Sequence, residues 1–125
     1  MNEVAVRALQ DFGRDLGFDN LLPEGTDAAH WQCENDDLMG FIGLEGEILC
    51  YLQRSYEPFV LNSLWEALFS LVDQEEWRDR QWHIGLTKEG QLVVFSFLSQ
   101  EGLGSEILHK TFNEIWQLRE VLSQL

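Results

Sequence analysis

The sequence predicts an α+β fold in which a mostly antiparallel, twisted sheet packs against three helices, in the order α-β-β-β-α-β-β-α. Apolar residues recur with helical spacing in three segments and alternate with a period of two in five others. Acid-Gly pairs and short polar turns separate neighbouring strands, so these strands pair as antiparallel hairpins and leave the helices to cover the sheet. A length of 125 residues favours a single domain spanning 1–125.

The three helices are predicted over 2–16, 58–72 and 105–125. In the first, Ala5, Leu9, Phe12 and Leu16 share one face, and Gly17 stands where a left-handed residue would end the helix. In the last, Ser105 is the expected N-cap.

The five strands are predicted over 28–34, 38–44, 47–54, 81–87 and 91–98, with a polar connection at 73–80. Tight turns are expected at Glu45-Gly46 and at 88–90. The strand over 47–54 is partly apolar on both faces, which indicates that its second face also packs against another surface.

The second helix is too apolar for a free surface. Apolar side chains cover most of its circumference, which is typical of a helix buried on more than one side and indicates a subunit interface. The candidates for this interface lie on the helix and on the strand after it: Leu61, Trp65, Leu68, Phe69, Trp82 and Ile84.

Charge is the strongest compositional signal, with a formal net charge of −14. Such a chain would repel phosphates, which argues against nucleic acid or an anionic membrane as partners. No segment approaches the length of a membrane helix, and no export signal is evident. The two cysteines are too few for a disulfide framework, so we expect a cytoplasmic protein with reduced thiols.

Catalytic and metal-binding patterns are weak. His30 and Cys33 have a zinc-like spacing, but they would point to opposite faces of a strand, and only Cys50 and His83 could complete a site. We expect no metal, no cofactor and no enzymatic activity; a small enzyme using Cys33 or Cys50 is the hypothesis from another class.

The segment ALQDFGRDLGFDNLLPEG at 8–25 resembles the helix-to-sheet junction of class I chaperones of bacterial type III secretion, the Tir-chaperone-like (CesT) family, with Leu16-Gly17-Phe18 in the matching place. Small size, acidity and element order extend the resemblance over nearly the whole chain. It implies a cytoplasmic, ATP-independent homodimer that binds the N-terminal segment of a secreted effector and keeps it soluble and competent for secretion. Pockets for that segment are expected near the first helix and first strands, at Val6, Phe18, Trp31, Cys33 and Phe41.

A second interpretation uses the acidity differently. The chain would then be an immunity or inhibitor protein that masks the basic surface of a toxin or enzyme. Association with such a folded partner would slow steeply with salt, whereas binding of an unfolded segment through apolar contacts would depend on salt only modestly.

Overall fold

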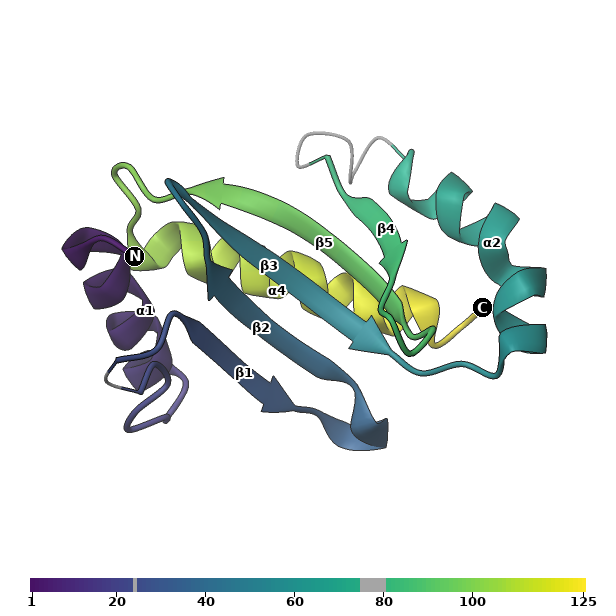
Figure 1. The fold of residues 1–125 in the computed structure, drawn as a ribbon, viewed down its shortest axis with the longest axis horizontal. Helices are drawn as coiled ribbons and strands as arrows, with labels where there is room; N and C mark the ends of the chain where they lie inside the picture. Colours follow the sequence, from purple (N-terminus) through teal and green to yellow (C-terminus); the bar gives the residue numbers. More distant parts are fainter. Residues whose placement is uncertain (24, 75–80) are drawn as a thin grey trace.

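The structure, a computed structural model, describes residues 1–23, 25–74 and 81–125. Within them, five strands form one sheet in the order β1-β2-β3-β5-β4, and every neighbouring pair is antiparallel (Figure 1). The strands are β1 (Ala28–Gln32), β2 (Leu38–Gly43), β3 (Glu47–Arg54), β4 (His83–Leu86) and β5 (Leu92–Ser99); the helices are α1 (Glu3–Asp15), α2 (Pro58–Val72) and α4 (Ser105–Leu122), with a 3-10 turn, η1 (Glu34–Asp36). The predicted α+β class and its antiparallel sheet are confirmed.

The helix ends explain how the chain enters the sheet. At the start of α1 the Asn2 side chain accepts a hydrogen bond from the amide of Ala5, 2.7 Å away. At its end Gly17 has a φ of 88°, its amide bonds to the carbonyl of Arg14, and the amide of Phe18 bonds to that of Gly13. This pattern is a Schellman motif, which turns the chain sharply toward β1 and confirms the predicted stop at Gly17.

Three local predictions differ from the structure. Ser105 is not the N-cap of α4, because that position is held by Gly104, which has no side chain to offer. Leu16 is 37% exposed, because it follows the last helical residue and no longer follows the buried stripe. The predicted strand over 81–87 is shorter in the structure, since Gln81 has a φ of 53° and pairing begins at His83. The polar connection predicted at 73–80 lies largely outside the described residues.

One face of the sheet forms the core. Side chains from β2, β3 and β5 meet the buried stripes of α1 and α4, and Phe12 packs edge-on against Phe41 with ring centroids 5.6 Å apart. Burying each such large apolar side chain contributes about 1.5–3 kcal/mol to stability. The fully buried members include Leu9, Phe12, Met39, Phe41, Ile48, Leu52, Leu108, Ile115 and Leu118.

The other face of the sheet carries half-buried side chains. In Figure 1 α4 runs behind the sheet, while α2 lies beside the edge strand β4. The uncovered face carries Leu49 and Tyr51 on β3 and Phe97 on β5, and Phe97 is 40% exposed. The expectation that the second face of β3 meets something remains a prediction.

The close approach of β1 to β2 gives a stability prediction. A Cβ added to Gly40 would lie 2.5 Å from the carbonyl oxygen of Ala29 and 2.8 Å from the hydroxyl of Tyr51. Gly40→Ala should therefore lower the free energy of unfolding in urea by about 1–3 kcal/mol, because a backbone atom must move. Gly85→Ala is the matched control, since its Cβ would meet only a Phe95 ring atom at 3.5 Å; an equal loss in both variants would contradict the explanation.

Candidate functional site

The exposed side of α2 carries large apolar side chains. Phe59 is 83% exposed, Phe69 is 57% exposed, and Trp65 stacks on Phe69 with ring centroids 5.7 Å apart. The opposite side of the helix buries Leu61 and Leu68. Exposed aromatic side chains at this density are typical of interaction surfaces rather than of a solvated helix.

The structure divides the six predicted interface residues. Leu61, Leu68 and Trp82 are buried in the core of their own chain, so they support the surface from beneath and do not form it. Trp65 and Ile84 are half-buried, and only Phe69 is exposed. Helical periodicity identified the apolar helix but, because apolar residues cover most of its circumference, could not tell its inner side from its outer side.

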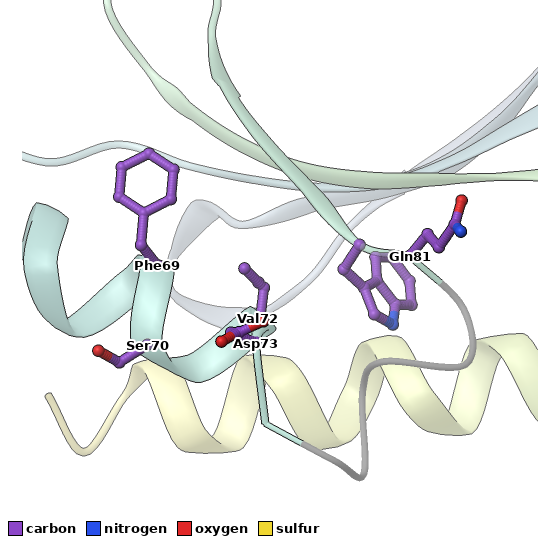
Figure 2. Close-up of a pocket in the computed structure, with 6 residues that line it drawn as sticks. Phe69, Ser70, Val72, Asp73 and Gln81 are labelled. Carbon is purple, nitrogen blue, oxygen red and sulfur yellow. The ribbon is translucent and has the colours of Figure 1, made fainter.

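A hollow of about 590 Å³ lies beside this surface, between the end of α2 and the start of the segment that leads into β4. Figure 2 shows Phe69, Val72 and Asp73 on the α2 side and Gln81 on the other. Trp82 lines the hollow, and its indole nitrogen is buried with no hydrogen-bond partner among the described residues.

A second apolar surface lies near the other edge of the sheet. Four rings follow one another there: Phe18 and Trp31 are 5.9 Å apart, Trp31 and Phe112 6.0 Å, and Phe112 and Trp116 6.0 Å. We call Phe18, Trp31, Phe112 and Trp116 the aromatic strip. Its two ends are the open ones, with Phe18 38% and Trp116 40% exposed.

The predicted effector-binding residues are only partly brought together. Phe18 and Trp31 belong to the aromatic strip, and half-buried Cys33 lies two residues after Trp31, just beyond the end of β1. Phe41 is buried beneath Trp31 at 6.0 Å, so it supports the strip from the core. Val6 lies elsewhere, in a hollow formed by α1 and the loop before β1.

Sequence reasoning missed the α4 half of the strip. Phe112 and Trp116 lie one helical turn apart on the last helix. That spacing places both rings on one side of α4, which is the signal that was available. Their meeting with Trp31 depends on how α4 crosses the sheet, and no local pattern reports that.

Among the described residues no strand pairs with the outer edge of β1 beside the strip, since β1 ends the sheet there. The amide of Gly43 bonds to the carbonyl of Asp27, and the amide of Cys33 bonds to that of Asp37, so odd-numbered β1 residues form the hydrogen-bonded pairs with β2. In an antiparallel ladder the intervening residues turn their backbone groups outward. The amides and carbonyls of Ala28, His30 and Gln32 therefore face away from β2, available to another strand.

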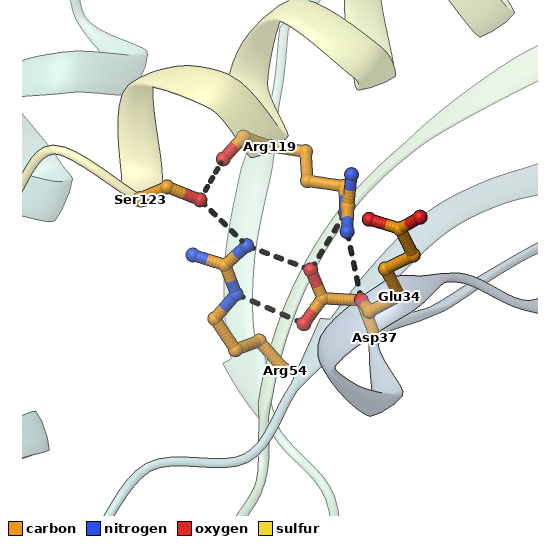
Figure 3. A network of polar contacts seen from close by, with 5 residues as sticks. All are labelled: Glu34, Asp37, Arg54, Arg119 and Ser123. Carbon is orange, nitrogen blue, oxygen red and sulfur yellow. Dashed lines mark hydrogen bonds and ion pairs between the residues drawn. The ribbon is translucent and has the colours of Figure 1, made fainter.

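A buried ion cluster lies where β2, β3 and α4 meet (Figure 3). Asp37, which is 1% exposed, accepts hydrogen bonds from Nε of Arg54 at 3.0 Å, from Nη2 of Arg54 at 2.7 Å and from Nε of Arg119 at 2.8 Å. Arg119 also donates to the backbone carbonyl of Glu34 at 2.7 Å, and Arg54 donates to the hydroxyl of Ser123 at 3.1 Å. One carboxylate thus joins two strands to the last helix.

The cluster sets the charge state of its members. Burial alone would raise the pKa of Asp37, but the hydrogen bonds and charges of Arg54 and Arg119 outweigh it and hold that pKa below its ordinary value. The hydrogen bonds to Asp37 raise the pKa of Arg54. Asp37 is therefore ionised at neutral pH and compensated by two arginines.

The described residues offer little for catalysis. Burial raises the pKa of the Cys33 thiol, and Cys50 is fully buried, so Cys33 lacks the lowered pKa and Cys50 lacks the access of a reactive nucleophile. His30 on β1 and Cys33 in the extended backbone after it are three residues apart, so their side chains point to opposite faces. Across residues 1–23, 25–74 and 81–125, no three His, Cys, Asp or Glu side chains gather as metal ligands. None of the helices in this part of the chain is long and apolar enough to span a bilayer.

The chain was compared with known proteins. No family model matches the sequence, and no curated protein matches it significantly. The fold does match solved structures. The ExsC–ExsE complex contains a chain with a TM-score of 0.73 and 16% identity, and the match covers 100% of this chain and 96% of that one.

Two further matches are described as chaperones. The HopA1–SchA chaperone–effector complex contains a chain with a TM-score of 0.70 and 15% identity over 98% of this chain and 94% of that one. The complex of the Yersinia pestis type III secretion chaperone SycH with a fragment of YscM2 gives a TM-score of 0.63 and 13% identity over 94% and 98%. The chain therefore has the fold found in these chaperone complexes along almost its whole length.

The ion cluster gives a pH-dependent prediction. Asp37→Asn should lower the free energy of unfolding at pH 7 by about 3–5 kcal/mol, because two buried arginines lose their counter-charge. Since the folded pKa of Asp37 is lowered, its contribution is complete above the ordinary value of 3.8 and is lost as pH falls through the folded pKa. Urea unfolding from pH 7 to pH 3 should show the gap between wild type and variant closing only at the acid end.

The control for this experiment is Asp11→Asn. Asp11 pairs with Arg14 on the surface of α1, where such pairs contribute about 0–1 kcal/mol. A gap between wild type and Asp37→Asn that stays constant down to pH 3 would contradict the assigned ionisation.

Proposed function

We propose that this protein is a non-enzymatic chaperone of bacterial type III secretion. It acts in the cytoplasm as a homodimer, binds the N-terminal segment of a secreted effector, and keeps that segment soluble and competent for secretion without ATP. The observation that carries the proposal is the agreement of fold over 94–100% of the chain with the solved chaperone complexes.

The binding surface we propose is the unpaired edge of β1 together with the aromatic strip. An extended segment that pairs with Ala28, His30 and Gln32 would place every second side chain on the face that carries Trp31. Backbone pairing supplies affinity for any extended chain, and the rings select apolar side chains at alternate positions. No covalent step is required.

The homodimer is proposed to form through the exposed side of α2. Phe59, Trp65 and Phe69 supply the apolar area. Most soluble homo-oligomers are two-fold symmetric, and one helix crossing its copy is self-complementary in the way this symmetry requires.

Acidity supports both this function and the inhibitor interpretation. A net charge of −14 keeps a protein with open aromatic surfaces soluble, and it also attracts a basic partner. The two differ in what they bind. A chaperone binds an unfolded segment with modest salt dependence, whereas an inhibitor binds a folded enzyme with an on-rate that falls steeply with salt.

The dimer is tested by light scattering across a dilution series. The wild-type protein should show a mass near twice the 14.5 kDa of the chain, and Phe69→Glu should show the single-chain mass because it places a charge in the apolar contact. Val4→Glu is the control, since Val4 is 54% exposed on α1 and should leave the dimer intact. A wild-type monomer at every concentration would overturn the proposed interface.

Effector binding is tested with overlapping peptides from the N-termini of secreted proteins of the source bacterium. At least one peptide should bind, and Phe18→Ala should weaken that binding about tenfold, because it removes an exposed aromatic anchor. Phe97→Ala is the matched control, with 40% exposure on the opposite face of the sheet against 38% for Phe18. Equal loss in both variants, or binding only to folded basic proteins, would contradict the proposal.

A further inference from the structure

Arg119 connects the buried ion cluster to the aromatic strip. One edge of its guanidinium donates to Asp37 at 2.8 Å and to the carbonyl of Glu34 at 2.7 Å. Its central carbon lies 4.8 Å from the centre of the Trp116 ring. A side chain that is itself 8% exposed therefore lies against a ring that is 40% exposed.

The position of Arg119 is fixed from three elements. Asp37 directly precedes β2, Glu34 belongs to η1, and Arg119 itself belongs to α4. Asn35 and Asp36 in that turn have left-handed φ values of 64° and 63°, so the carbonyl of Glu34 is presented by an unusual backbone. Because the N–H donors of a guanidinium lie in one plane, the hydrogen bonds to Asp37 and to the Glu34 carbonyl together fix the orientation of that plane.

Two stacking contacts of the Trp116 ring are seen among the described residues. One is with the guanidinium of Arg119, and the other is with Phe112, whose ring is 26° from parallel at 6.0 Å. An exposed indole with two stacking neighbours keeps one orientation only while both neighbours stay in place. Without the guanidinium, Trp116 would lose one of its two supports and its fixed orientation at the end of the strip.

We propose that Arg119 is a positioning residue for the partner-binding surface: it holds Trp116 so that the aromatic strip continues from β1 onto α4. This inference rests on the proposed function and assigns to it a residue that the partner need not touch. Its partner is an extended strand whose apolar side chains alternate with polar ones and reach Trp116 as well as Trp31.

The chemistry of that strand follows from the surroundings of the strip. Asp15 and Asp19 flank Phe18 in the sequence, and the side chains of Glu34 and Asp36 are exposed at the end of β1. The polar positions of the partner are therefore best filled by Lys or Thr, since acidic ones would be repelled. A synthetic peptide in which Leu alternates with Lys and Thr is a suitable probe.

Arg54 supplies a matched control. It shares the same carboxylate through two hydrogen bonds, at 3.0 and 2.7 Å, but it has no contact with Trp116 among those the structure describes. Arg54→Lys and Arg119→Lys both replace a fork of donors by a single ammonium and should lower the melting temperature alike. Only Arg119→Lys removes the group that stacks on Trp116.

The experiment measures binding and ring environment together. Protein labelled with fluorotryptophan is titrated with the probe peptide by fluorine NMR, and Trp31→Phe and Trp116→Phe assign the two resonances. In Arg119→Lys the Trp116 resonance should move in the free protein and the peptide should bind about five- to tenfold more weakly. In Arg54→Lys the Trp116 resonance and the affinity should match those of the wild type.

The outcomes separate the two proposals. If the peptide binds wild type and both lysine variants equally, Arg119 does not position the surface. If both variants lose affinity equally, the cluster acts through stability alone and the inference is overturned. If the wild-type protein shows no peptide-dependent shift of Trp31, the binding mode proposed for β1 fails first.

Discussion

The ion cluster around Asp37 is the interaction on which the arrangement of this molecule depends. It brings the start of β2, the end of β3 and the last turns of α4 to one point, with a carboxylate that is 1% exposed between two arginines. Removing charges from water is costly, and only good geometry with full hydrogen bonding offsets that cost. The alignment of α4 across the sheet is therefore specified at one end by charge, while apolar packing, which is less directional, holds the rest.

The same alignment creates the surface that we assign to the partner. Because Arg119 joins the C-terminal part of α4 to Asp37, the preceding turns of α4 bring Phe112 alongside Trp31 on the edge strand, with Trp116 stacked on Phe112. The N-terminus of α1 is joined to the sheet by a separate set of hydrogen bonds. Gln100, buried just after β5, accepts a hydrogen bond from the backbone amide of Asn2 and donates to the carbonyls of Leu44 and Glu47 at the β2–β3 turn. The two anchors lie at opposite ends of β3, so the helices cannot slide along the sheet without breaking one of them.

Local signals predicted the elements well, since each depends on neighbours in sequence. The α2 and β3 ranges agree residue for residue with the expectation, because Pro58 marks a first turn and Gly46 marks a hairpin. The site was predicted less well. Phe18 and Trp31 are in ring contact, but Phe41, Leu61 and Leu68 are core residues, and apolarity alone could not separate core from exposed contact. Arg119 and Asp37 are 82 residues apart in sequence, so no periodicity connects them.

The placement of the two apolar surfaces decides how dimerisation and partner binding combine. The α2 surface lies beside β4, and the aromatic strip lies beside β1, at opposite edges of a five-stranded sheet. A two-fold contact through α2 would therefore leave both β1 edges free, one on each protomer. A single partner chain that reached both edges would gain from the second contact without any new chemistry, because the second binding event becomes intramolecular. A dimer interface at β1 would instead occupy the edge with which the partner would pair. The position of the dimer contact therefore bears directly on the proposed function.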